Sequence, residues 1–266
     1  MPASPHPAFT DIDTRLEELE EQGYTIFPQY LQSETTAAVR AHIDHLAGPV
    51  TSAPSNKARR DLRHPIPGAI MAQLASNPVT LELAARLIGS DPTNLRMREQ
   101  VLIRSDPSTP PYEPARWHID AAFNRAEFAA RPKQVYYQML HCCSQVNPGG
   151  AAFHIIPGSH KKSLANPALQ QQPTIETQTL SMPELGPDAG VEICVEDGDL
   201  VVFNPLCYHA ASPNRTQQPR YVLFTSFYHP SATRLVELVR RTKYRDQFPD
   251  SLRQALPAHL QSLLDN

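Results

Sequence analysis

The chain has 266 residues, 41% of them hydrophobic, which is enough to bury a substantial core and is compatible with a single β-barrel or sandwich domain. The formal net charge of −3 and the lack of any dense run of lysine and arginine argue against nucleic acid or an anionic membrane as the main partner. Four cysteines without CxxC spacing, no stretch of about 18 apolar residues and no secretory signal in the Pro-rich start predict a soluble cytoplasmic protein with reduced thiols.

The first 90 residues are predicted to be mainly helical. Apolar periodicity, capping residues and terminal glycines indicate a helix from Thr10 to Gly23, a strand at 24–27, a helix from Ser33 to Gly48 and a helix over 78–88. The segment between the last two helices, 51–67, has no periodicity. It carries four basic residues against one acid, namely Lys57, Arg59, Arg60, Arg63 and Asp61. We predict a solvated loop there. The alternative is a lid whose arginines meet an anionic group on a substrate.

After residue 95 the pattern changes to short strands between turn-rich connections, which is typical of an antiparallel barrel or sandwich. Strands are predicted over 95–104, 134–143, 151–156, 191–195, 199–204 and 221–228, followed by helices over 233–264 that prolines interrupt. In the first of these strands, alternation puts Glu99 on one face and Gln100 on the other. Either inward face would therefore carry polar side chains.

His118 and Asp120 are candidate metal ligands. Residues two apart in an extended segment point the same way, so an imidazole and a carboxylate can share one face of an octahedral site, to which His209 would add a third ligand. Three protein ligands leave positions open for redox chemistry with O2, whereas a fourth side chain would close a structural zinc site. A His-x-Asp triplet also occurs by chance, so a turn with a simply hydrogen-bonded histidine remains an alternative at this point.

Further motifs follow in a fixed order. They are Trp117-His118-Ile119-Asp120, Pro157-Gly158-Ser159-His160, Gly198-Asp199, His209 and, eleven residues later, Arg220. This order resembles the phytanoyl-CoA dioxygenase family of Fe(II)- and 2-oxoglutarate-dependent oxygenases, most closely over 95–228. The resemblance implies a mainly β fold with flanking helices around a double-stranded β-helix, or jelly-roll, core. We expect one domain over 1–266, with a helical N-terminal part at about 10–90 and C-terminal helices at about 233–264.

The resemblance also implies roles for individual residues. His118, Asp120 and His209 would bind Fe(II), and Arg220 would hold the far carboxylate of the co-substrate 2-oxoglutarate, for which a planar guanidinium suits a bidentate pair. We expect Arg220 to begin a strand beside the one that carries His209. Gln100 matches a glutamine that contacts the co-substrate in ectoine hydroxylase and its relatives. Many relatives have serine where this chain has Ala211, so the missing hydroxyl is assigned to Ser212 or, alternatively, to Tyr137 or Thr225.

Asp120 narrows the expected chemistry, because relatives that halogenate have a small residue in its place. The resemblance therefore implies O2-dependent hydroxylation or another oxidation by hydrogen abstraction, such as desaturation or ring closure. The expected substrate is a small molecule, an anionic or natural-product scaffold, and the expected assembly is a monomer or homodimer. Two alternatives stay open: a non-catalytic jelly roll that keeps a metal for structure or sensing, and a zinc hydrolase built on the same three ligands.

Overall fold

The computed structural model describes residues 6, 9–63, 66–112, 116–175, 189–241 and 248–265. Its strands are β1 (Tyr24–Phe27), β2 (Ala53–Pro54), β3 (Arg59–Leu62), β4 (Arg96–Ser105), β5 (Ser108–Thr109), β6 (Gln138–Cys142), β7 (Phe153–Ile155), β8 (Val191–Ile193), β9 (Leu200–Phe203), β10 (His209–Ala211) and β11 (Arg220–Tyr228). Its helices are α1 (Ile12–Gln22), α2 (Ser33–Ala47), α3 (Ser55–Ala58), α4 (Ala69–Ala75), α5 (Pro78–Ile88), α6 (Arg125–Ala129), α7 (Ser159–Ala165), α8 (Pro167–Gln170), α9 (Thr233–Arg241) and α10 (Asp250–Ala255), with the short 3-10 helices η2 (Pro92–Asn94) and η3 (Ala258–Leu264). No helix among these is long and apolar enough to cross a membrane.

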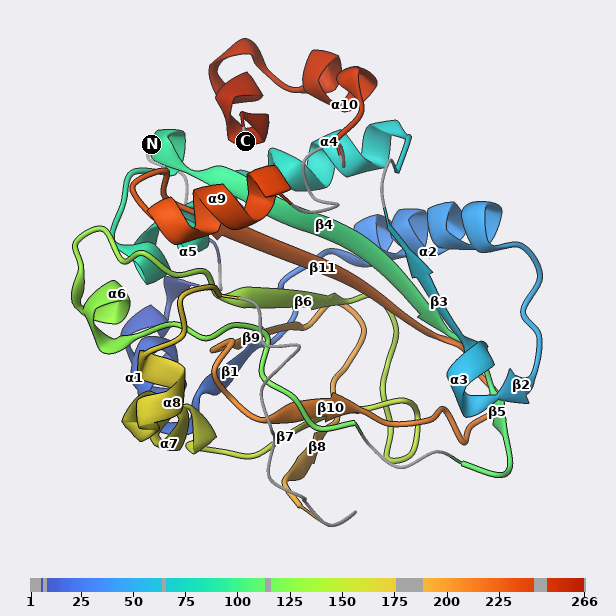
Figure 1. Cartoon of the computed structure of the whole chain (residues 1–266). Coiled ribbons are helices and arrows are strands. Elements are labelled where there is room, and N and C mark those ends of the chain that lie inside the picture. The colour runs from blue at the N-terminus through green and yellow to red at the C-terminus, as the bar shows by residue number, and fades with distance from the viewer. Residues whose placement is uncertain are drawn as a thin grey trace.

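Two antiparallel sheets form the centre of the molecule (Figure 1). The major sheet has six strands in the order β1-β9-β6-β11-β4-β3, and the minor sheet has three in the order β10-β7-β8. An apolar cluster between them takes side chains from both sheets, including Leu140 and Val222 from the major sheet and Phe153 and Ile193 from the minor one. This two-layer arrangement confirms the predicted jelly-roll core with flanking helices.

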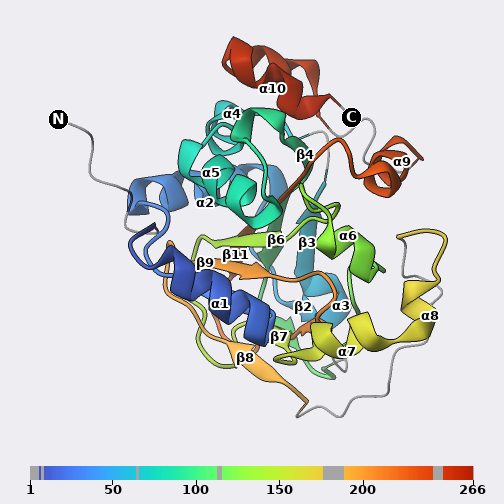
Figure 2. The same cartoon turned by 90° about the vertical axis from the view of Figure 1, so that its left-hand side faces the viewer.

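Helices cover the outer face of the major sheet. Figure 2 shows α2, α4 and α5 gathered on that side, while β7 and β8 lie on the opposite side. The outward-facing side chains Leu102, Leu223 and Met139 belong to a large apolar cluster that extends from Ile12 in α1 to Leu264 in η3. Because the sheet is thus covered on both faces, the even and the odd positions of one strand are both buried. One set packs against the helices, and the other faces the space between the two sheets.

Several predicted elements agree closely with the structure. The strand at 24–27 and the helix at 78–88 coincide with β1 and α5, and Gly23 and Gly89 end α1 and α5 in the left-handed conformation that glycine favours. The segment 51–67, predicted to be a loop, contains regular structure, because residues 53–62 form β2, α3 and β3. Ser159 to Gln170, for which no element was predicted, form α7 and α8. In the Pro-rich start of the chain, 1–9, the structure describes residues 6 and 9, and the segment 176–188 lies outside the described residues.

The path from His209 to Arg220 differs from the prediction. We expected the two residues on neighbouring strands, but His209 lies in β10 of the minor sheet and Arg220 begins β11 of the major sheet. The prediction is wrong because the connection crosses the sandwich and does not return as a hairpin. As a consequence, the two residues project from opposite walls of the space between the sheets.

Candidate active site

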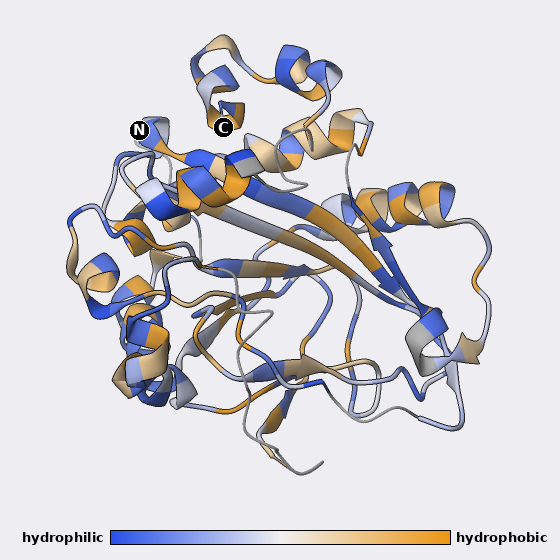
Figure 3. Cartoon of the chain, in the orientation of Figure 1, coloured by the Kyte–Doolittle hydropathy of each residue, from blue (hydrophilic) through white to orange (hydrophobic). Residues whose placement is uncertain are grey.

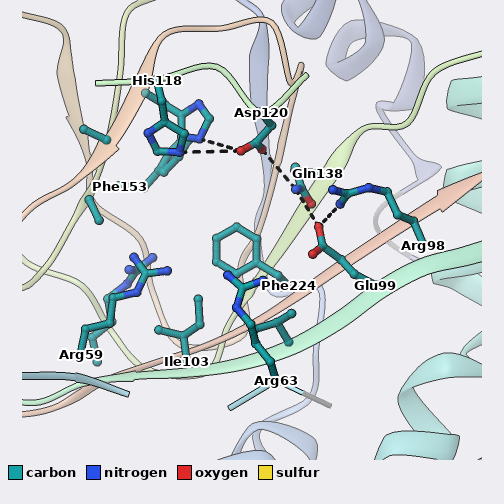
Figure 4. A pocket seen from close by; sticks show the side chains of 15 residues that line it. Arg59, Arg63, Arg98, Glu99, Ile103, His118, Asp120, Gln138, Phe153 and Phe224 are labelled. Carbon is teal, nitrogen blue, oxygen red and sulfur yellow. Dashed lines mark hydrogen bonds and ion pairs between the residues drawn. The ribbon is translucent and has the colours of Figure 1, made fainter. Parts of the chain in front are cut away.

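A cavity of about 220 Å³ opens between the two sheets. Its described lining consists of Arg59, Arg63, Arg98, Glu99, Val101, Ile103, His118, Asp120, Gln138, Phe153, His209, Ala210, Ala211, Arg220 and Phe224. Figure 4 shows polar groups at its two ends, with Phe224 between them and Ile103 beside Arg59 and Arg63. The cavity therefore combines an apolar floor with a small number of convergent charged groups, as binding sites generally do.

His118, Asp120 and His209 meet on the minor-sheet side of this cavity. One ligand atom from each lies within 4.8 Å of the other two. The Asp120 Oδ1 atom is 3.7 Å from Nε2 of His118 and 3.5 Å from Nε2 of His209. Backbone pairing fixes the arrangement, because His118 and His209 exchange two hydrogen bonds of 2.9 Å and the amide of Asp120 donates to the carbonyl of Pro205 at 2.8 Å.

Hydrogen bonds at the far side of each imidazole orient the two histidines. The Nδ1 atom of His118 donates to the carbonyl of Arg116, and the Nδ1 atom of His209 donates to the carbonyl of Cys207, each at 2.9 Å. A protonated Nδ1 leaves the lone pair on Nε2, the atom that faces Asp120 in both residues. This is how metal-binding histidines are usually held, so the donor set fits a divalent metal ion.

The three groups also influence each other's ionisation. Burial alone would raise the pKa of Asp120, but the facing imidazoles of His209 and His118, together with Arg98, hold it well below its usual range. The surrounding protein and the neighbouring His209 lower the pKa of His118, although 51% of its side chain is open to solvent. Both shifts favour an ionised carboxylate and a neutral imidazole, which are the metal-binding forms.

A chain of hydrogen bonds links Asp120 to the major sheet. The amide nitrogen of Gln138, in β6, donates to Oδ2 of Asp120 at 3.2 Å and to Oε1 of Glu99 at 2.9 Å. Glu99 in turn accepts a short hydrogen bond from Arg98. The Arg98 guanidinium lies 4.2 Å from the centre of the Tyr136 ring. Gln138 therefore joins the carboxylate of the triad to a buried ion pair.

A bulge in β4 explains why Arg98 and Glu99 both line the cavity. Ser226 is opposite Glu99 and Phe227 is opposite Met97, so the register shifts here and Arg98 is one extra residue in β4. Strict alternation would send two consecutive side chains to opposite faces, and a β-bulge re-aims one of them. The prediction from alternation alone therefore fails at this position.

Arg220 lies across the cavity from the histidines. The residue is only 7% exposed, its Nε atom is buried without a hydrogen-bond partner, and none of the carboxylates among the described residues forms an ion pair with it. Burial, followed by the nearby positive charge of Arg59, lowers the pKa of Arg220 to about 10, so the guanidinium is still charged at neutral pH. A buried cation without a counterion is costly, and its presence at a cavity indicates an anionic ligand.

The other residues predicted to contact the co-substrate are not among the described residues that line the cavity. Gln100 is on the outer face of β4, where its amide donates to the carbonyl of Met71 at 3.1 Å, and it is not among the described lining residues. The Ser212 hydroxyl donates to the carbonyl of Ala152 at 3.0 Å. Tyr137 hydrogen-bonds Lys133 and Thr225 hydrogen-bonds His141, both away from this cavity.

No serine, threonine or tyrosine is found among the described residues that line the cavity. The predicted hydroxyl partner for the co-substrate therefore has no counterpart in this part of the structure. Glu99 and Gln138 were not predicted as site residues, although both lie in predicted strands, where alternation separates the side chains of one face from those of the other. The sequence did not reveal which of the two faces looks toward the cavity. In the structure Glu99 of β4 and Gln138 of β6 belong to that face.

A jelly roll that presents two histidines and one carboxylate is the arrangement that non-haem Fe(II) oxygenases use. The model of the phytanoyl-CoA dioxygenase family matches residues 19–222, and the chain belongs to that family. The family suggested by the order of the sequence motifs is thereby confirmed. No curated protein is similar enough in sequence to be matched.

Solved structures share the fold at low sequence identity. The non-haem α-ketoglutarate-dependent epimerase SnoN from nogalamycin biosynthesis is 18% identical, with a TM-score of 0.60 over 82% of this chain and 83% of that chain. EvdO2 from Micromonospora carbonacea var. aurantiaca, solved with 2-oxoglutarate, is 17% identical, with a TM-score of 0.58 over 81% and 90%. HygX from Streptomyces hygroscopicus, solved with nickel and 2-oxoglutarate, is 16% identical, with a TM-score of 0.58 over 84% and 88%.

Proposed function

We propose that this protein is an Fe(II)- and 2-oxoglutarate-dependent oxygenase that oxidises a C–H bond of a small molecule. One observation carries the proposal. The three ligand atoms of His118, Asp120 and His209 lie within 4.8 Å of one another, in the same cavity as the buried guanidinium of Arg220, for which the described residues provide no counterion. A metal-binding triad alone would suit several classes of enzyme, but a buried cation beside it favours a co-substrate with a carboxylate at its far end.

In this proposal His118, Asp120 and His209 hold the iron. The two Nε2 atoms and the Asp120 carboxylate would be its protein ligands, a set that leaves coordination positions for exogenous ligands. Gln138 donates to Oδ2 of Asp120, which would leave Oδ1, the oxygen near both imidazoles, to bind the metal. When bound, iron together with 2-oxoglutarate and O2 supplies the oxidising power that breaks a C–H bond.

Arg220 orients the co-substrate in this proposal. Arg220 begins β11 in the major sheet and lines the same cavity as the triad, so a dicarboxylate bound there would meet both. Charge-assisted, bidentate pairing supports both affinity and orientation. The apolar side chains Phe153, Ile103 and Phe224 line the space between and limit the access of water to the reacting carbon.

The reaction we propose is hydroxylation or a related oxidation that begins with hydrogen abstraction. The presence of Asp120 supports this, since a carboxylate at that position occupies the place that a halide would need. SnoN is described as an epimerase and HygX has been solved with hygromycin B. Those reactions and ligands belong to those proteins, and for this chain they support only the idea that a small molecule enters the cavity.

Succinate formation tests the proposal. We expect the purified protein to convert 2-oxoglutarate to succinate with Fe(II) and O2, and to be inhibited by N-oxalylglycine. His118→Ala and Asp120→Ala should abolish both turnover and metal binding. Arg60→Gln is the matched control, because Arg60 lies on the outer side of β3 and hydrogen-bonds Thr51 at 3.3 Å. Full succinate formation by Asp120→Ala would show that the proposal is wrong. Metal-dependent hydrolysis without any use of 2-oxoglutarate would instead favour the zinc-hydrolase alternative.

A further inference from the structure

Two further arginines line the cavity. Arg59 in β3 and Arg63 just after it are 37% and 41% exposed at their side chains and lie beside Ile103 and Phe224. Figure 4 shows both guanidinium groups reaching into the space that separates them from His118 and Asp120. We infer that Arg59 and Arg63 bind a carboxylate of the primary substrate. The inference rests on the proposed function, because the charges of the metal and of 2-oxoglutarate enter the argument.

The edge position of β3 makes these side chains available. β3 is the last strand of the major sheet and pairs only with β4 among the described strands. It is mostly hydrophilic, whereas the adjacent middle of β4 is hydrophobic (Figure 3). Alternation directs Arg59, Asp61 and Arg63 to one face, and Arg60 to the other, where it approaches Asp106 at 3.9 Å. The two cavity arginines thus form a row along the rim of the sandwich.

Asp61 fixes the two guanidinium groups without neutralising both. Its Oδ1 atom accepts a hydrogen bond of 2.6 Å from Nε of Arg59, and its Oδ2 atom lies 3.7 Å from Nη2 of Arg63. One acid between two bases leaves one positive charge, and each guanidinium keeps further N–H donors for a ligand. Two planar guanidinium groups held in place by one shared carboxylate are well suited to bind a planar anion.

A charge count indicates a single negative charge on the substrate. Arg98 and Glu99 offset each other, and Arg220 offsets the far carboxylate of 2-oxoglutarate. Asp120 and the near carboxylate together offset the two charges of the metal. What is left is Arg59 plus Arg63 minus Asp61, a net charge of +1. A carboxylate matches this charge, whereas a phosphate monoester, with a charge of about −1.5 to −2 at neutral pH, exceeds it.

The apolar floor sets the second requirement. Phe224 lies between the arginines and the metal-binding triad, Ile103 lies beside the arginines, and Phe153 contributes to the lining on the minor-sheet side. A substrate whose carboxylate sits at the arginines would lay its carbon skeleton on these side chains and bring a C–H bond to the triad. The expected substrate class is therefore a carboxylic acid with an apolar chain or ring between the carboxylate and the reacting carbon.

Binding of matched acids and amides tests the inference. The protein, loaded with Fe(II) and saturated with 2-oxoglutarate without oxygen, is titrated calorimetrically with 3-phenylpropanoate, indole-3-acetate, octanoate and N-acetylphenylalanine, and with the primary amide of each. We expect at least one acid to bind tenfold or more tightly than its amide, a difference of about 1.4 kcal/mol. Arg59→Gln and Arg63→Gln should each reduce this preference to less than threefold, whereas Arg60→Gln, with the same loss of charge from the same strand, should retain it.

Three results of the titrations with acids, amides and phosphate would overturn the inference. They are the absence of any preference for an acid over its amide, a preference that survives in both variants, and tighter binding of phenethyl phosphate than of every acid. The affinity for 2-oxoglutarate is measured in the same variants and should stay within twofold of the wild type. An equal loss of 2-oxoglutarate affinity would also overturn the inference, because the arginines would then belong to the co-substrate.

Failure of the proposed function gives a different pattern. If 2-oxoglutarate does not bind in a metal-dependent manner, or if Arg220→Gln leaves its affinity unchanged, the oxygenase proposal fails whatever the acids do. If 2-oxoglutarate binds as proposed and no acid is preferred, only the carboxylate inference fails. Both substituted side chains are substantially exposed, so folding of the variants is expected to be unaffected, and a thermal melt verifies this before titration.

Discussion

The two faces of the major sheet each bury an arginine, and the two arginines are treated in opposite ways. Arg104 in β4 and Arg220 in β11 lie one register position apart, since Arg104 is opposite Tyr221 and Arg220 is opposite Ser105. Arg104 points outward to the helices and Arg220 points inward to the cavity. Both are removed from bulk water, so the desolvation cost is similar in kind, and only the partners differ.

Every donor of Arg104 is engaged. Its guanidinium donates to both oxygens of Asp106 at 2.6 and 3.1 Å, to Asp44 at 2.9 Å, and to the carbonyls of Gly48 and Pro49 at 2.7 and 3.0 Å. Those contacts attach the end of α2 to the sheet. Arg220 has no such set among the described residues. A compensated buried charge serves the fold, whereas an uncompensated one in a cavity is kept for a ligand.

Replacing Arg104 should have the largest effect on stability. Arg104→Met leaves the fully buried carboxylate of Asp106 without its main partner, which in comparable pairs costs about 3–5 kcal/mol. Urea denaturation of the metal-free protein measures the loss. The exposed Arg60→Gln should change stability by less than about 0.5 kcal/mol. A small effect of Arg104→Met would show that the hydrogen bonds and ion pairs of Arg104 do not stabilise the fold, and the contrast with Arg220 would then be wrong.

Replacing Arg220 should have the opposite signature. Arg220→Gln removes a charge that burial disfavours, so the free energy of unfolding of the ligand-free protein should be unchanged or higher. The affinity for 2-oxoglutarate should fall by about 10- to 100-fold, the value of one or two charge-assisted hydrogen bonds. Calorimetry and denaturation on the same samples separate the two effects. A large loss of stability would assign Arg220 to the fold and contradict the proposed role.

His141 extends the comparison to pH. It lies on the outer face of β6, where burial lowers its pKa to about 4 and its Nε2 is 3.1 Å from the hydroxyl of Thr225. In the unfolded chain a histidine has a pKa near 6.5, so the unfolded state takes up the proton first as the pH falls. Stability should therefore drop by up to about 2 kcal/mol between pH 6.5 and 5 and be flat above pH 7. His141→Gln should show a smaller slope in chelator-treated protein, and an unchanged slope would place the titration elsewhere.

Two glutamines on opposite faces provide the finest test. Gln138→Leu leaves Asp120 without its amide donor and should weaken metal binding about tenfold, as is usual for a partner of a metal ligand. Gln100→Leu, in β4, should leave metal and 2-oxoglutarate affinities unchanged, because its amide bonds Met71 on the outer face. Equilibrium titrations with Mn(II) and with 2-oxoglutarate report both. Weaker 2-oxoglutarate binding by Gln100→Leu would instead support the contact between Gln100 and the co-substrate that the resemblance implied.

The order of motifs determined a great deal about this protein by itself. Residues two apart on an extended segment point the same way whatever surrounds them, so His118 and Asp120 could be paired from spacing alone. The order of the five motifs from Trp117-His118-Ile119-Asp120 to Arg220 indicated the family, which the match over 19–222 confirms. Local signals of this kind also located β1 and α5, since capping and periodicity act within a few residues.

Only the tertiary structure decided which face of each strand looks inward. Glu99 and Gln100 are equally polar neighbours, and what separates them is the side on which α4 packs and the bulge at Arg98, both of which depend on contacts between distant parts of the chain. The same holds for Arg59 and Arg63, because a segment without periodicity did not predict the strand β3. The pairing of β3 with β4 brings Arg59, and Arg63 directly after the strand, to the cavity, because burial and the direction of a side chain are properties of the assembled sheets and not of the local sequence.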